Sequence, residues 1–199
     1  MKKVLSLLLI FSFFVSKSQS ELLDSVSLAL APEYLTIQAA LENPTAVVRL
    51  NLRKQKLKKF PEEIYQLPNL QYLDISKNSI TELPDSIVKL KNLQYLIASR
   101  NGLKTLPKNI GELQNLVHLN VNQNEIEVIP YSFGNLEKLE IADLWSNNLS
   151  YFPETMANLK NLKWMDLRNI LISVTNQERL RAWLPDTEIK FSPACNCAN

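Results

Sequence analysis

Residues 93–115 read LQYLIASRNGLKTLPKNIGELQN, and a pattern of the same 23-residue length begins at residues 47, 70, 93, 116 and 139. Leu or an equivalent apolar residue fills the first, fourth and sixth positions, and Asn typically fills the ninth. A sixth copy begins at Leu162 and then departs from the pattern. Because each unit of a fixed-period repeat needs its neighbours to bury its apolar face, the sequence predicts a solenoid of stacked repeats.

The first half of each copy predicts a short strand, because the apolar fourth and sixth positions alternate with outward-facing positions. These apolar pairs are Leu50/Leu52, Leu73/Ile75, Leu96/Ala98, Leu119/Val121, Ala142/Leu144 and Met165/Leu167. Strands that recur after a return segment of constant length stack in parallel. We therefore predict about six parallel strands in one sheet.

The second half of each copy predicts a short helix or helical turn on the outer face, which makes the fold class α/β. An apolar residue followed by Pro recurs in five copies, with further apolar residues three and six positions later. Proline at the start and apolar spacing of three are typical of a short helix. The prolines are Pro61, Pro84, Pro107, Pro130 and Pro153.

The ninth position predicts a ladder of side-chain amides at the point where the chain leaves each strand. It is occupied by Asn78, Asn101, Asn124 and Asn147, and by Gln55 and Ile170 in the end copies. A buried amide there can donate to and accept from the backbone groups of the turn. These asparagines are therefore interpreted as structural and not as ligand-binding residues.

The two ends predict caps that cover the outermost repeats. Residues 33–43 predict a helix that stops before Pro44, and Thr175 to Glu178 reads as a capping box that opens a helix with Leu180 and Trp183 inward. Residues 188–191 predict a closing strand. The expected divisions are an N-terminal helical cap at 21–46, repeats at 47–172 and a C-terminal cap at 173–192.

Residues 1–20 predict a secretory signal peptide. A positive start precedes an apolar run of about 12 residues, and Ser18 and Ser20 offer alternative cleavage sites. The run is shorter than a membrane-spanning helix, so we expect no span in the mature chain. The mature chain is expected to be secreted, periplasmic or at the cell surface. Residues 193–199 form a tail with Cys195 and Cys197, which is interpreted as flexible, with pairing to another chain as the alternative.

Charge argues against a nucleic-acid partner. The chain has 22 basic and 20 acidic residues, but three of the lysines and none of the acids lie in residues 1–20. Residues 21–199 therefore carry 19 basic against 20 acidic residues, so they create no strong positive field.

The segment Leu83-Pro84-Asp85-Ser86-Ile87-Val88-Lys89-Leu90 resembles the signature of the leucine-rich repeat family, in its 23-residue bacterial and plant-like subclass. The resemblance extends over about 125 residues. It implies a right-handed horseshoe with strands on the concave face, short helices on the convex face and caps at both ends. It also implies a protein-binding scaffold that uses the concave face, although one fold hosts many functions.

The third, fifth and seventh positions of each copy are expected to face the concave side and to form columns across the strands. Tyr and Trp are enriched among interface anchors, so aromatic columns favour a partner-binding face. The alternative is that these aromatic side chains only pack on one another across the sheet. The candidate residues are Tyr72, Asp74, Tyr95, Ile97, Arg100, His118, Asn120, Asp143, Trp145, Trp164, Asp166 and Arg168.

Three functions are weighed on these residues. Binding of a protein or peptide is favoured, and stacking of glycan rings on Tyr and Trp is the alternative. A hydrolase built on Asp143 and Asp166 is less favoured, because the single histidine, His118, has no nucleophile tied to it by a motif. We therefore expect no catalytic residues, no metal site and no cofactor.

Overall fold

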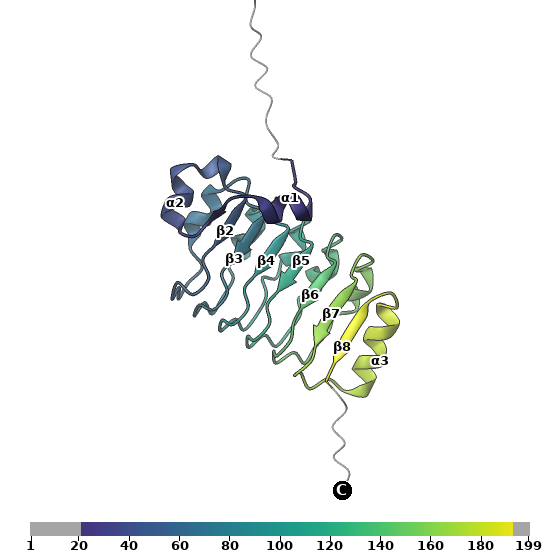
Figure 1. The fold of residues 1–199 in the computed structure, drawn as a ribbon. Helices are drawn as coiled ribbons and strands as arrows, with labels where there is room; N and C mark the ends of the chain where they lie inside the picture. Colours follow the sequence, from purple (N-terminus) through teal and green to yellow (C-terminus); the bar gives the residue numbers. More distant parts are fainter. Residues whose placement is uncertain (1–20, 193–199) are drawn as a thin grey trace, which may run out of the picture.

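The computed structural model describes residues 21–192, so the expected signal peptide and cysteine tail lie outside the described residues. Eight parallel strands form one open sheet in chain order (Figure 1). The strands are β1 (Glu33–Tyr34), β2 (Arg49–Asn51), β3 (Tyr72–Asp74), β4 (Tyr95–Ile97), β5 (His118–Asn120), β6 (Ile141–Asp143), β7 (Trp164–Leu167) and β8 (Glu188–Phe191). The predicted α/β solenoid is confirmed, with six repeat strands and one further strand at each end.

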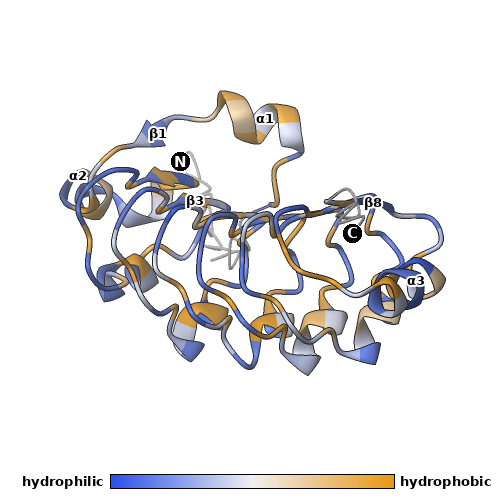
Figure 2. Cartoon of the chain, turned by 90° about the horizontal axis from the view of Figure 1, so that it is seen from below, coloured by the Kyte–Doolittle hydropathy of each residue, from blue (hydrophilic) through white to orange (hydrophobic). Residues whose placement is uncertain are grey.

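The return segments form short 3-10 helices on the side opposite the strands (Figure 2). Proline is the N-cap of four of them, and in the third copy the helix starts three residues after Pro107. A 3-10 helix rises about 2.0 Å per residue, so a few residues span the outer face. They are η2 (Glu62–Gln66), η3 (Asp85–Lys89), η4 (Ile110–Glu112), η5 (Tyr131–Asn135) and η6 (Glu154–Asn158).

The ninth-position asparagines join consecutive repeats by hydrogen bonds. Asn124 Nδ2 donates to the carbonyls of Ala98, in the preceding copy, at 3.1 Å and of Val121 at 2.8 Å. Its Oδ1 accepts from Leu103 N at 3.1 Å. Asn78, Asn101 and Asn147 repeat this pattern. One amide therefore satisfies turn backbone groups in two repeats at once.

The eighth position of each copy has a left-handed backbone, with φ between 52° and 60°. Such a conformation costs a non-glycine residue roughly 1 kcal/mol. It is held by the next repeat, as when Lys77 N donates to Ser99 O at 2.9 Å and Arg100 N donates to Asn122 O at 2.9 Å. The six residues are Lys54, Lys77, Arg100, Gln123, Ser146 and Asn169.

The N-terminal cap differs from the helix predicted over residues 33–43. Residues 33 and 34 form β1, which pairs with β2, and α2 (Ile37–Glu42) begins only after its N-cap Thr36. A short 3-10 helix, η1 (Pro44–Ala46), follows. The predicted start of the helix is wrong because the exposed edge of β2 takes up a further strand.

The C-terminal cap contains α3 (Val174–Trp183) and the predicted closing strand β8. The expected capping box at Thr175 is wrong by two residues, because Ser173 is the N-cap and its hydroxyl accepts from Asn176 N at 3.3 Å. Leu180 is fully buried and Trp183 packs at the edge of the core. In residues 21–192, no helix has the length and apolar character needed to cross a membrane.

A further helix, α1 (Ser25–Leu30), was not predicted from the sequence as a separate element. It lies on the strand side of the sheet, away from the 3-10 helices (Figure 2). Asp24 caps it by accepting from Val26 N and Ser27 N. Leu28 is its one buried residue, and it is only 2% exposed. The helix therefore covers part of the face on which the sequence predicted a binding surface.

Candidate partner-binding face

The strand register aligns the third-position side chains in a continuous row. Arg49 Cζ lies 5.0 Å from the centre of the Tyr72 ring. The Tyr72 and Tyr95 ring centres are 6.1 Å apart, and those of Tyr95 and His118 are 5.7 Å apart. Ile141 and Trp164 continue the row on β6 and β7. The aromatic side chains therefore pack on one another across the strands, and the third-position residues lie on one face of the sheet.

The first part of this row lies under α1. A cavity of about 120 Å³ remains between the helix and the sheet, lined by Ser25, Leu28, Ala29, Arg49, Tyr72 and Tyr95. Tyr72 and Tyr95 are half-buried. Burial also raises the pKa of the Tyr72 hydroxyl. The expectation that these two tyrosines form an open surface is therefore corrected, because the chain itself covers them.

Two glutamines hold the segment that precedes α1. Gln71 Oε1 accepts from Leu23 N at 2.9 Å, and Gln94 Nε2 donates to Leu23 O at 2.9 Å and to Gln71 Oε1 at 2.8 Å. Gln71 is fully buried. Sequence reasoning missed this contact. The available signal was Gln at the second position of two consecutive copies, a position that the repeat pattern does not define.

Most fifth-position side chains accept a hydrogen bond from the backbone of the turn that follows their strand. In five copies a side-chain oxygen accepts from the backbone N–H two residues later, as in Asp74 Oδ1 from Ser76 N at 2.7 Å. This Asx turn ends the strand. Asp74 is 5% exposed and Asp166 is 2% exposed, so their expected place on an open surface is corrected.

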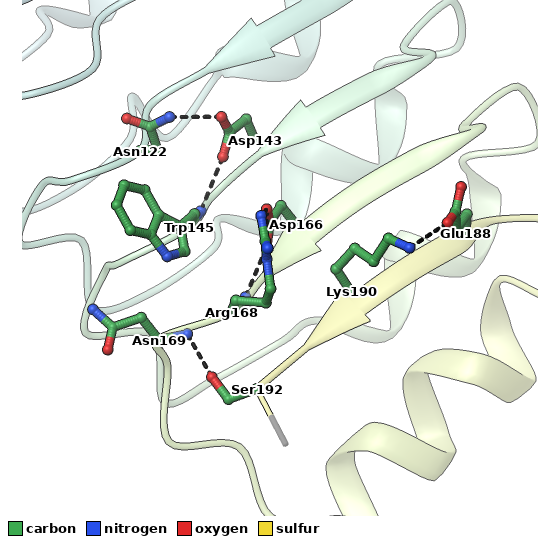
Figure 3. A network of polar contacts seen from close by, with 9 residues as sticks. All are labelled: Asn122, Asp143, Trp145, Asp166, Arg168, Asn169, Glu188, Lys190 and Ser192. Atoms are coloured by element: carbon green, nitrogen blue, oxygen red, sulfur yellow. Dashed lines mark hydrogen bonds and ion pairs between the residues drawn. The ribbon is translucent and has the colours of Figure 1, made fainter. Parts of the chain in front are cut away.

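Asp166 forms an ion pair, whereas Asp143 is held by hydrogen bonds alone (Figure 3). Arg168 Nη2 lies 2.6 Å from Asp166 Oδ2, and Arg168 Nε also donates to both carboxylate oxygens. Asp143 accepts from Asn122 Nδ2 at 2.6 Å and from Trp145 N at 3.2 Å. Across residues 21–192 no ion pair includes Asp143. Burial first, and the neighbouring Asp166 in addition, raise the pKa of its carboxyl.

The part of the face beyond α1 forms a mixed surface, which we name the open face. Trp145 and Trp164 have intermediate exposure there, and Trp145 adjoins Asp143. Burial lowers the pKa of His118, so its imidazole is neutral at pH 7. The open face comprises His118, Asn120, Asn122, Ile141, Asp143, Trp145, Trp164 and the exposed Arg168. Large flat side chains beside polar groups suit recognition of a partner.

The remaining predicted residues lie outside the open face. Ile97 is half-buried on β4 between the covered and open parts. Arg100 is exposed in the turn after β4, where its Nε donates to Gln123 Oε1. The described residues contain no group of three His, Cys, Asp or Glu that could hold a metal ion.

Comparisons with known proteins agree with the repeat architecture. A family model described as "Leucine-rich repeat region" matches residues 46–104, and one described as "Leucine Rich Repeat" matches residues 115–136. No curated protein matches the chain. A leucine-rich repeat protein of Leptospira interrogans is 31% identical with a TM-score of 0.64, over 81% of this chain. The match covers 49% of that protein, so the chain spans about half its length.

Two further solved structures share the fold. Internalin C2 of Listeria monocytogenes is 27% identical with a TM-score of 0.64, over 76% of this chain and 64% of its own. The ectodomain of the plant receptor kinase GASSHO1/SCHENGEN3 from Arabidopsis thaliana is 20% identical with a TM-score of 0.61, over 81% of this chain and 20% of its own. The second likeness concerns the fold alone. With its 23-residue period, its ladder of asparagines and these matches, the chain belongs to the leucine-rich repeat family.

Proposed function

We propose that this chain is a non-enzymatic scaffold that binds a protein or peptide through the open face. The observation that carries the proposal is the contrast between two sets of aromatic residues. Tyr72 and Tyr95 line the cavity beneath α1. Trp145 and Trp164 have the same intermediate exposure but belong to the part of the sheet beyond that cavity, where Trp145 adjoins Asp143, a carboxylate that no ion pair of residues 21–192 includes. An aromatic surface of this kind gains free energy when a partner removes it from water.

The shared fold is compatible with a binding role. The plant receptor ectodomain was solved in complex with CASPARIAN STRIP INTEGRITY FACTOR 2. We carry the idea of a polypeptide ligand from that protein to this one as part of the proposal. The signal-like residues 1–20 support a secreted, periplasmic or surface location for the encounter.

The test compares three forms of residues 21–199 as bait for proteins of the producing organism, identified by mass spectrometry and then titrated in purified form. The first is the wild type, and the second carries Trp145→Ala and Trp164→Ala. The third carries Tyr131→Ala, which removes a 61%-exposed aromatic ring from the opposite side of the repeats. We expect one partner to bind the wild type and the Tyr131 variant, and to bind the double Trp variant at least roughly tenfold more weakly.

Equal binding of that partner by all three forms would contradict the use of the open face. Thermal midpoints are measured in parallel, because a loss of folding in the double Trp variant would otherwise imitate a loss of contact. A single Trp164→Phe variant, which keeps an aromatic ring of smaller area, should fall between the wild type and the double variant.

Glycan binding is the second candidate, since half-exposed Trp145 and Trp164 beside Asn120 and Asn122 offer rings for stacking and amides for sugar hydroxyls. A polysaccharide panel run with the same three forms separates the two. Retention on a polysaccharide that depends on the two tryptophans, without any protein partner, would replace the protein-binding proposal by the glycan one.

A further inference from the structure

Cationic side chains gather on the turns that follow β2, β3 and β4. Lys54, Lys77 and Arg100 occupy the eighth position of three consecutive copies, and Arg53 precedes Lys54. Adjacent parallel strands lie about 4.8 Å apart, so the three equivalent positions extend over roughly 10 Å. We name Arg53, Lys54, Lys77 and Arg100 the basic row.

No carboxylate neutralises the basic row within the described part of the chain. None of the six ion pairs of residues 21–192 includes any of its members. Within residues 21–192, the guanidinium of Arg100 donates to the neutral side chain of Gln123 and to no carboxylate. The pKa of Lys77 is lowered, first by the positive charge of Arg53, then by burial, and then by Arg100 and Lys54. The like charges therefore repel one another.

The fold itself does not require these charges. Copies four to six build the same left-handed turn with Gln123, Ser146 and Asn169 at the eighth position. Asn and Gly adopt this backbone with less strain than Lys or Arg. The first three copies thus combine a strained left-handed backbone with mutual repulsion. An uncharged residue would avoid the repulsion, and Asn or Gly would also reduce the strain.

We propose that the basic row binds an acidic segment of a polypeptide partner. The inference rests on the proposed function, because it names the chemistry of one part of the same partner. Side chains on one face of an extended peptide repeat about every 7 Å, so two acidic side chains span most of the row. The seventh-position column continues from Arg53 toward Trp145 and Arg168, so one ligand can contact the open face and the basic row together.

Charge favours a short acidic segment over a larger polyanion. Residues 21–199 carry 19 basic against 20 acidic residues, so the protein has no broad positive field, and the positive charge is a local one to which the exposed Lys56, Lys58 and Lys59 add beside the row. Nucleic acids and anionic membranes are bound by broader positive surfaces. A local cluster of cations in a near-neutral protein is complementary in charge and size to a short run of carboxylates instead.

The test uses a fluorescent peptide of about ten glutamates, with an all-glutamine peptide, an oligonucleotide and anionic phosphatidylserine vesicles as comparisons. The row variant carries Lys54→Asn, Lys77→Asn and Arg100→Asn. The matched control carries Lys58→Asn, Lys104→Asn and Lys160→Asn, which removes the same charge from exposed lysines that form no ion pair in residues 21–192. Asn suits the left-handed turn, so the row variant should keep or raise the thermal midpoint.

We expect the glutamate peptide to bind the wild type and the control at low salt, and the row variant at least roughly tenfold more weakly. Binding should weaken as salt is added. No binding by the wild type, or equal weakening in the row variant and the control, would overturn the proposal. Tighter row-dependent binding of the oligonucleotide or the vesicles would also overturn it.

The double Trp variant separates this inference from the proposed function. It should still bind the glutamate peptide, because the peptide contacts the basic row and not the tryptophans. If the row binds glutamate while the Trp changes leave partner capture unaltered, the open-face proposal fails and the row remains. If the Trp changes abolish partner capture while the wild type does not bind the glutamate peptide, the basic-row proposal fails and the open-face proposal stands.

Discussion

At the scale of single residues, position in the repeat decides what a polar side chain does. The Asn of the ninth position and the Asp or Asn of the fifth are both directed to backbone groups of the turns. An unsatisfied buried backbone group is costly, so the ninth-position amides are committed to structure, whereas Asn120 at a fifth position uses only its side-chain oxygen in the turn. Recognition is left to residues whose polar atoms and rings are not used in this way, such as Trp164.

The Asn ladder gives a first prediction. Asn101→Ala removes hydrogen bonds to Ile75 O, Ala98 O and Ile80 N, and we expect a loss of about 1–3 kcal/mol in the free energy of unfolding. Urea denaturation measures it. Asn148→Ala, at an exposed position beside the ladder, serves as the control and should stay within about 0.5 kcal/mol. Equal effects of the two changes would contradict the role of the ladder.

His118 gives a prediction on pH. Its native pKa lies below the ordinary value of 6.5 because of burial, so the unfolded state binds more protons in the window below pH 6.5. Stability is therefore lost as the pH falls through this window. Asp143 acts in the opposite sense at lower pH, because its native pKa is raised above 3.8. His118→Gln should remove the loss that is due to the imidazole.

The measurement is the unfolding free energy of the wild type and of His118→Gln between about pH 7.5 and 5.5. The difference between the two curves isolates the histidine from the carboxyl groups that titrate in both proteins. Parallel curves would mean that His118 is as accessible to water in the native state as in the unfolded chain.

At the scale of elements, α1 and the 3-10 helices show two kinds of packing. The six residues of α1 rest on the sheet mainly through Leu28. The 3-10 helices instead pack on one another from repeat to repeat, most closely around Gly111 and Gly134. A helix as short as α1 is not stable alone, so its position depends on the surface that it meets.

The contribution of Leu28 to this docking can be measured. Leu28→Ala should weaken docking of α1 by roughly 2 kcal/mol, because a fully buried leucine is replaced by a smaller side chain. Hydrogen exchange of residues 25–30 should then become faster, and Tyr72 and Tyr95 should become more reactive to tyrosine modification. Leu30→Ala, at a residue 81% exposed on the same helix, should change neither quantity. Unaltered exchange in the Leu28 variant would contradict the docking.

The close approach of the 3-10 helices gives a matched pair of glycine changes. A Cβ on Gly134 would lie 2.1 Å from Thr155 O, so Gly134→Ala must shift backbone and should cost about 1–3 kcal/mol. A Cβ on Gly102 would lie 3.6 Å from Thr81 Cγ2, an ordinary contact. Gly102→Ala should therefore leave the midpoint of urea unfolding nearly unchanged, and a larger effect there than at Gly134 would contradict the packing of η5 against η6.

At the scale of the whole molecule, the two halves of the concave face differ in access. The half toward the N-terminus carries α1 over its tyrosines and the basic row along its turns. The half toward the C-terminus carries the open face and ends at β8. A partner that contacts Trp164 and the basic row would therefore lie along the solenoid and across several repeats.

The sequence alone determined the solenoid, the order of its parallel strands, the outer helical turns and the amide ladder. These features follow from interactions that repeat every 23 residues, so each copy of the pattern predicts the same contacts with its neighbours. The ends were predicted less well, since Glu33 and Ser173 have no equivalent in the repeats against which to compare them.

Only the tertiary structure decided which of the predicted site residues are accessible. The contact between Gln94 and Leu23 joins residues 71 positions apart. A single short helix is not repeated along the sequence, so no periodic pattern predicts where it docks. Asp166 and Asp143 occupy the same repeat position, yet one is buried against Arg168 and the other keeps its charge unpaired. Periodicity specifies the backbone, whereas exposure depends on the particular side chains and segments that meet across repeats.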